Sequence, residues 1–267
     1  MDGYIPLGYG DLALAGLLVL ANAGLSLYLE LGIHRRLVVA ALRSIIQLTL
    51  VGLVLTALFT HVSLLWTGLV FAVMVVFAGR EAVGRQERPL AGWWSYGLGT
   101  GSMLAAVLVT VLALTIGLRP DPWYDPRYAV PLLGMVLGNT MTGAALGLNA
   151  LTTGLATRRA AVEAQLMLGA GRLEAFRPVV RQALRSALMP IVNTMAATGV
   201  VSLPGMMTGQ ILGGVVPAEA VKYQIFVLFL IAGGTGLGAA AAVLGGANRL
   251  SDSRHRLRLD RLAAARD

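Results

Sequence analysis

The chain has 267 residues and a formal net charge of +8, and 57% of its residues are hydrophobic while only 13% are charged. A soluble domain carries roughly a quarter charged residues, so this composition, with a mean hydropathy of +0.74, excludes a water-soluble globular protein. Cysteine is absent, which excludes disulfides, thiolate metal sites and cysteine nucleophiles. His34, His61 and His255 stand alone, without partners at metal-ligand spacing.

Apolar stretches dominate the chain and set its fold class. A helix needs about 20 apolar residues to cross ~30 Å of hydrocarbon, and its backbone groups must be satisfied internally. The stretches do not alternate polar and apolar residues as barrel strands do. We therefore predict an all-α integral membrane protein, a single transmembrane domain over 1–267 with about seven transmembrane helices. The predicted spans are 12–29, 37–59, 64–77, 94–116, 128–151, 188–207 and 221–245.

The basic residues fall mostly in alternate loops, which predicts the orientation. Arginines gather at 35–36, 80–88 and 158–185 and in the tail, 247–267. Because cytoplasmic loops accumulate Arg and Lys, we predict an external N-terminus and a cytoplasmic C-terminus. The same bias explains the net positive charge, so we expect no nucleic-acid partner. The tail is predicted to be an amphipathic helix on anionic lipid, in preference to a solvated terminus.

Glycine and lysine placement carries two further predictions. Lys222 is the only lysine, so the chain cannot form a P-loop, and any ATP-driven work requires another polypeptide. Small residues four apart let membrane helices approach closely, either within the chain or across a dimer. The run Gly233–Gly238 is predicted to serve the same close packing. The spaced sets are Gly134 and Gly138; Gly143 and Gly147; and Gly205, Gly209 and Gly213.

The segment 187–217 is unusually rich in proline, glycine and polar residues. A helix broken at membrane depth frees backbone groups, which are tolerated only where they line a cavity or are buried in protein. A transport path would satisfy them. Arg43 and Gln47 lie one turn apart on the second span, where Arg43 either snorkels to the headgroups or faces such a path.

The segment 151–188 is predicted to be a cytoplasmic coupling loop. Its apolar positions, interleaved with arginines, describe short amphipathic helices joined at 169–171, suited to a partner's groove or to the lipid surface. The loop resembles the EAA loop of ABC-transporter permeases, which docks into an ATPase subunit, although Arg181 and Gln182 replace the expected Leu-Pro. The resemblance implies a docking set of Glu163, Gly169, Ala170, Leu173 and Phe176.

Longer motifs follow along the chain: RSIIQLTLVGLVL at 43–55, VPLLGMVLGNTMTGAALGLN at 130–149, ALRSALMPIVN at 183–193, VSLPGMMTGQILGG at 201–214 and AVKYQI at 220–225. Together they resemble the motifs of FetB-type iron-export permeases. The resemblance implies a non-enzymatic permease of the cell membrane that acts as a homodimer with separate FetA-type ATPase subunits. ATP and Mg would bind to those subunits, and this chain would hold no cofactor. The implied cargo is iron.

Other functions stay open at this point. Plant relatives of this family are associated with aluminium tolerance and sugar-nucleotide export, so another metal ion or a sugar nucleotide remains an alternative cargo. An ion-driven secondary transporter is a further alternative, but that class is marked by inverted repeats, and no convincing duplication is present. Polarity and membership of these motifs suggest path residues, whose metal ligands remain unknown: Arg43, Gln47, Asn139, Thr140, Met141, Asn193, Ser202, Pro204, Met206, Met207, Thr208 and Gln210.

Overall fold

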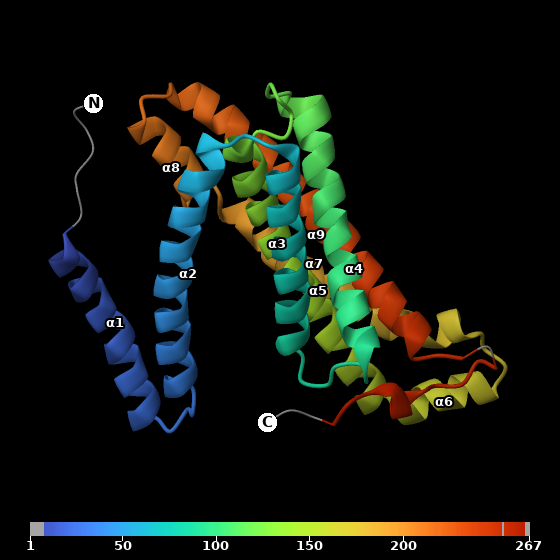
Figure 1. Ribbon diagram of the computed structural model, residues 1–267. Coiled ribbons are helices and arrows are strands. Elements are labelled where there is room, and N and C mark those ends of the chain that lie inside the picture. Colours follow the sequence, from blue (N-terminus) through green and yellow to red (C-terminus); the bar gives the residue numbers. More distant parts are fainter. Residues whose placement is uncertain (1–7, 253, 265–267) are drawn as a thin grey trace. The chain divides into compact units, whose positions relative to one another are not determined.

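A computed structural model describes residues 8–252 and 254–264, and this part of the chain is helical with no β-strand (Figure 1). It divides into two compact units, residues 1–62 and 63–267, each of which is described by itself. The helices are α1 (Tyr9–Tyr28), α2 (His34–Thr60), α3 (Leu64–Gly84), α4 (Trp93–Leu112), η1 (Ala113–Leu118), α5 (Pro126–Thr157), α6 (Arg159–Met167), α7 (Arg172–Ala197), α8 (Gly205–Leu212), α9 (Pro217–Arg249) and η2 (Leu259–Arg261).

The first unit is a hairpin of α1 and α2. Ser26, at the end of α1, closes the turn, since its carbonyl oxygen accepts from Leu31 N at 2.9 Å and its hydroxyl accepts from Ile33 N at 3.2 Å. The most apolar window of α1 is 11% buried and that of α2 is 0% buried. Two apolar helices with so little buried surface are suited to a hydrocarbon environment.

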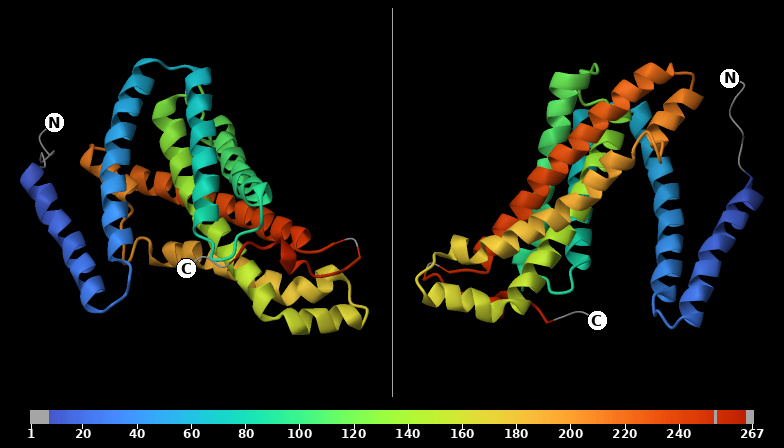
Figure 2. Two further views of the ribbon diagram at one scale, coloured as in Figure 1. Left: turned by 60° about the horizontal axis from the view of Figure 1, so that its bottom comes forward. Right: turned by 180° about the vertical axis from the view of Figure 1, so that it is seen from behind.

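The second unit is a bundle built around α5, which packs against α3, α4, α7 and α9 (Figure 2). The start of α5 is locally encoded: the Asp125 carboxylate accepts from Arg127 N at 2.9 Å, and Pro126 stands in the first turn, where no N–H is needed. Helix α9 closes the bundle by packing also against α4, α7 and α8.

Glycines bring the central helices together, as predicted. A Cβ on Gly143 of α5 would lie 2.7 Å from Thr235 Cγ2, and one on Gly238 of α9 would lie 2.9 Å from the Ser102 carbonyl oxygen. The packing role is therefore confirmed for Gly143 and, within the run 233–238, for Gly234 and Gly238. It is not found at Gly138, Gly205, Gly209 or Gly233, where a Cβ would meet nothing within 4 Å.

The number of spans differs from the prediction. Six helices are long and apolar enough to cross a membrane, and the predicted sixth span, 188–207, is wrong as a single helix. Helix α7 already begins at Arg172, carries Arg181 and Arg185, and ends at Ala197, so its hydropathy stays low. The candidate spans are α1, α2, α3, α4 with η1, α5 and α9.

Helix α7 nevertheless runs the length of the bundle. Both α5 and α9 run from the top of Figure 1 toward the end at which α6 lies, and α7 carries the chain back between them. The predicted interruption of 187–217 is confirmed, but it lies at 198–204 and 213–216, since the helix continues through Pro190.

The tail prediction is wrong in its secondary structure. In the described residues after α9 the chain is mostly extended, with one turn of 3-10 helix, η2. The cause is local: the Asp252 carboxylate accepts from the backbone N–H groups of Arg254 and Arg256, at 3.0 and 2.9 Å. Such side-chain bonds to the backbone compete with the helical pattern.

Candidate functional site

Helices α6 and α7 form an elbow at the end of the bundle. The turn between them is closed by Gly169 N, which donates to Leu166 O, and by Ala170 N, which donates to Gln165 O, both at 3.1 Å. Gly169 has a φ of +93°, in the region that disfavours side chains with a Cβ. The predicted pair of amphipathic helices joined at 169–171 is therefore confirmed, although the second helix is much longer than expected.

The outer surface of the elbow is apolar at its turn. Met167, Leu168 and Leu173 are 82%, 88% and 77% exposed, and we call these three residues the apolar tip. Leu173 was among the predicted docking residues, whereas Met167 and Leu168 were missed. Their position directly before Gly169, at the end of an amphipathic helix, was the available signal.

The other docking candidates have different positions. Phe176 is only 3% exposed and packs with Val162 and Val179, so it anchors the elbow to the bundle and is not on its surface. Glu163 forms an ion pair with Arg159, one turn before it on α6, at 2.8 Å. Ala170 is partly exposed in the turn.

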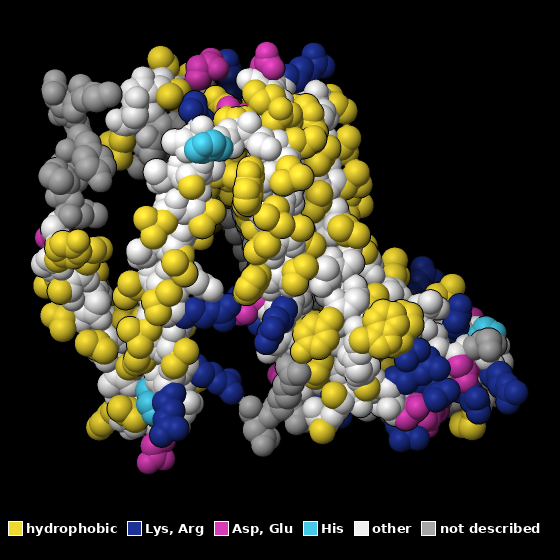
Figure 3. Space-filling view, viewed as in Figure 1, with side chains coloured by type: hydrophobic (Ala, Val, Ile, Leu, Met, Phe, Trp, Pro, Cys, Tyr) yellow, Lys and Arg dark blue, Asp and Glu magenta, His cyan; other side chains and the backbone are white. Residues whose placement is uncertain are grey.

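Charge surrounds the elbow. On the face shown in Figure 3, hydrophobic side chains cover α3 and α4, while Lys and Arg gather at the end beside α6. Exposed arginines flank the apolar tip on both helices, at Arg158 and Arg159 before it and at Arg177 and Arg181 after it. The exposed apolar tip is therefore surrounded by positively charged side chains, whose electrostatic potential attracts an acidic surface.

The predicted path residues of α5 point in different directions. Asn139 is exposed and its side-chain amide donates to Met135 O at 2.9 Å. Thr140 is fully buried against α9, and its hydroxyl has no partner in the described part of the chain. Met141 is partly buried against the main core cluster. Only Asn139 of the three lies on an exposed surface.

The remaining candidates of the second unit surround the break after α7. Gly199, with a φ of +88°, donates its N–H to Ser202 O at 2.9 Å, and Pro204 then begins α8. Gln210 on α8 is half-buried, and its Oε1 has no partner among the described residues. The other candidates here are Asn193 and Thr208, both exposed, and Met206 and Met207, both partly buried.

Arg43 and Gln47 belong to the first unit, where both side chains are exposed on α2. Their suggested role stays a prediction. Across residues 8–252 and 254–264, no three His, Cys, Asp or Glu side chains come close enough together to hold a metal ion.

Comparisons with known proteins place the chain in a family. Residues 9–250 match the model of the "Uncharacterised protein family (UPF0014)". The "UPF0014 membrane protein slr1647" of Synechocystis is 37% identical over 85% of this chain and 87% of its own length. The "Protein ALUMINUM SENSITIVE 3" of Arabidopsis thaliana is 34% identical over 83% of this chain and 79% of its own.

A bacterial relative carries a functional name. The "Probable iron export permease protein FetB" of Escherichia coli is 29% identical over 92% of this chain and 93% of its own length. No solved structure matches the chain. With six candidate spans and relatives named as membrane proteins, the chain is a multi-pass membrane protein and belongs to the UPF0014 family.

Proposed function

We propose that this chain is the membrane subunit of an ABC-type exporter that moves iron out of the cell, driven by a separate ATPase subunit. The proposal is supported by the permease motifs of the sequence and by the similarity to a protein named as a probable iron export permease. Two copies of the chain would form the path in the cell membrane, and the elbow would lie on the cytoplasmic side.

Energy would come from the partner. The single lysine, Lys222, lies on α9 in an ion pair with Glu219 at 2.7 Å and is followed by Tyr223, so it cannot belong to a P-loop. ATP and Mg would therefore bind to the ATPase subunit, and this chain would not be an enzyme.

The exposed apolar tip is the observation that carries the proposal. Three large apolar side chains stand on a folded elbow, which is anchored from below by Phe176. A folded elbow of this kind suits a groove on a partner protein, because little conformational entropy is lost when a preformed surface binds. Closure of an ATPase dimer would then push directly on the start of α7.

Helix α7 would carry that push to the path. It has 26 residues, so it spans about 39 Å from the elbow to the break at 198–204. The break, α8 and the turn after it contain most of the polar candidates and two left-handed glycines, Gly199 and Gly214, at which backbone angles can change. Alternating access would arise as α7 displaces this segment.

The identity of the cargo is a more specific proposal than the transporter class. Iron is favoured by the FetB similarity, while another metal ion or a sugar nucleotide is the alternative within the same transporter class. An ion-driven secondary transporter is the alternative from another class, and it would need no ATPase partner.

Inverted membrane vesicles that contain both subunits provide the test. We expect ATP-dependent accumulation of radioactive ferrous iron inside the vesicles, and none with this chain alone. ATP-dependent uptake of a sugar nucleotide or another metal instead would keep the transporter class and change the cargo. Iron uptake that follows an imposed ion gradient without the ATPase would contradict the proposal.

A further inference from the structure

The tail crosses the end of the bundle beside the elbow, and we call residues 250–264 the tail strap; position 253 lies outside the described residues. Its far end is joined to the α3–α4 loop by two backbone hydrogen bonds. Ala91 N donates to Arg261 O at 2.7 Å, and Ala263 N donates to Pro89 O at 2.8 Å. These bonds flank an antiparallel bridge between Leu90 and Leu262.

Apolar contacts fix the strap to four other elements. Leu257, Leu259 and Leu262 pack against one cluster of buried residues. That cluster includes Leu90 of the α3–α4 loop, Val162 of α6, Phe176 of α7 and Ala247 of α9. The strap therefore shares one core with the elbow, which the basic composition of the tail did not suggest.

A hydrogen bond ties the strap to the elbow itself. Arg172 N, in the first turn of α7, donates to His255 Nδ1 at 3.1 Å. Gly171, the N-cap residue, has no side chain to satisfy this turn, so a histidine 83 residues further along the chain does so. The neutral ring then carries its proton on Nε2.

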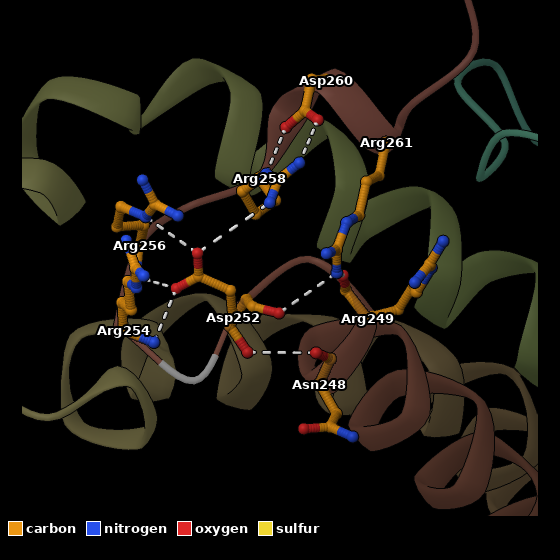
Figure 4. Close-up of polar contacts among 9 residues, drawn as sticks. Asn248, Arg249, Asp252, Arg254, Arg256, Arg258, Asp260 and Arg261 are labelled. Atoms are coloured by element: carbon orange, nitrogen blue, oxygen red, sulfur yellow. Dashed lines mark hydrogen bonds and ion pairs between the residues drawn. The ribbon is translucent and has the colours of Figure 1, made fainter.

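The arginines of the strap are engaged within it and with the end of α9 (Figure 4). The Arg256 guanidinium pairs with Asp252 at 2.8 Å, and Arg258 pairs with Asp260 at 2.7 Å. Arg261 Nη1 donates to Arg249 O at 2.7 Å. The two ion pairs hold the shape of the strap itself and neutralise much of the positive charge that a lipid-bound tail would present, while the Arg261 bond joins the strap to the end of α9.

We infer that the tail strap positions the elbow, holding the apolar tip in the orientation that the ATPase subunit binds. The inference rests on the proposed function for the identity of the partner. The mechanical part rests on the contacts alone: one segment ties the α3–α4 loop, the end of α9 and the start of α7. Releasing it frees the elbow to turn about the end of α5.

A matched pair of double variants tests the inference. The release variant is H255G with A263P, which deletes the histidine acceptor and the Ala263 N–H donor. The control is H255N with A264P. Asparagine keeps an acceptor near the Nδ1 position and tolerates the left-handed φ of +56° at residue 255, and Ala264 N makes no bond to the described residues. Glycine also tolerates this φ, so neither variant adds strain at residue 255.

The first measurement reports the elbow without any partner. Nitroxides on G84C and A164C, both exposed positions, report the distance between the end of α3 and α6, and the chain has no native cysteine to interfere. We expect a narrow distance distribution in the wild type and the control and a broad one in the release variant. An unchanged distribution in the release variant would overturn the strap's role.

The second measurement uses the ATPase subunit. In the release variant, an elbow that is correctly oriented about one tenth of the time should raise the apparent Kd for the ATPase subunit about tenfold. ATP turnover at saturating ATPase subunit should stay unchanged. Normal ATPase affinity in the control variant, H255N with A264P, would show that the weaker binding of the release variant comes from the position of the elbow and not from a general loss of fold. Equal affinity of both variants, despite a mobile elbow, would overturn the positioning inference. A wild type that binds no ATPase would contradict the proposed function instead, and the distance measurement would still decide whether the strap holds the elbow.

Discussion

Gly169 and Gly171 flank Ala170 in the elbow turn but differ in backbone conformation. Gly169 has a φ of +93°, whereas Gly171 has a φ of −67° and a ψ of 154°, which any residue adopts. A Cβ at either position would meet nothing within 4 Å, so space does not distinguish them. Only backbone strain does.

G169A should therefore loosen the elbow, and G171A should not. The left-handed conformation costs a residue with a Cβ about 1–2 kcal/mol, whereas alanine at 171 fits its extended conformation. Hydrogen exchange over 159–180 should accelerate in G169A alone, with lower affinity for the ATPase. Equal protection of the two variants would show that the turn does not depend on this φ.

Two carboxyl groups of the tail strap titrate abnormally. The hydrogen bond from the Arg258 side chain lowers the pKa of Asp260 from 3.8 to about 2, and the backbone hydrogen bond from Arg256 lowers the pKa of Asp252. A lowered folded-state pKa stabilises the strap at any pH above about 3.8, and that contribution disappears as the pH falls toward 2.

The end of the strap around Asp260 should accordingly stay ordered at pH 5 and loosen between about pH 4 and 2. A nitroxide on A264C should report this as increased mobility. D260N removes one ion pair, so its label should be more mobile at pH 5 and should respond less to acid. Equal label mobility of D260N and the wild type at pH 5 would mean that Asp260 does not order the end of the strap.

Among the elements, α9 packs closely on α4 and α5 where glycine replaces a side chain. A Cβ on Gly238 would press on the backbone oxygen of Ser102 at 2.9 Å, while Gly233, on the exposed side of α9, has open space. The two residues lie in the same helix, so they form a matched pair.

G238A should destabilise the bundle and G233A should not. Overpacking costs about 1–3 kcal/mol, whereas alanine in an exposed helix position is favoured over glycine by about 1 kcal/mol. The Tm of the protein in detergent should fall for G238A and hold or rise for G233A. A fall of equal size in both would place the effect in the helix itself and not in the contact with α4 and α5.

The apolar tip allows an equally direct comparison on α6. L168D introduces a charge on a side chain that is 88% exposed, and Q165D introduces the same charge on an exposed polar position of the same helix. If the tip binds the ATPase, L168D should weaken the complex at least tenfold, since burying an unpaired carboxylate costs more than about 1.4 kcal/mol. Q165D should bind normally. Equal binding by both would remove the tip from the interface.

At the scale of elements, hydropathy and turn chemistry predicted most of the structure. The elbow followed from amphipathic pattern and a glycine turn, and the close packing of α5 with α9 followed from small-residue spacing. The tail strap did not follow, because its bonds join residues such as Arg172 and His255 that lie 83 positions apart. The resemblance placed Phe176 among the docking residues, but a motif does not tell which side of an amphipathic helix is covered, and the structure buries this side chain against Val162 and Val179.

Across the whole molecule, three of the four basic segments that positive-inside bias assigns to one side of the membrane lie together in the second unit, while 35–36 belongs to the first unit. The α3–α4 loop, the elbow and the tail contact one another through the strap. The predicted orientation requires that these basic segments lie at the same end of the bundle. Which end faces the cytoplasm stays a prediction. The sixth predicted span, 188–207, became part of α7, since a helix with arginines along its first half can link the elbow to the break but has low hydropathy.

The central claim is that cargo and ATP hydrolysis are coupled through this chain. ATP turnover by the two purified subunits in lipid, measured with and without ferrous iron, tests it most directly. The account predicts turnover that requires both subunits, rises with iron, and loses the iron response in L168D but not in Q165D. A complex that hydrolyses ATP at the same rate with and without iron would contradict iron as the cargo, and failure of the two chains to form a complex would contradict the ABC-type mechanism.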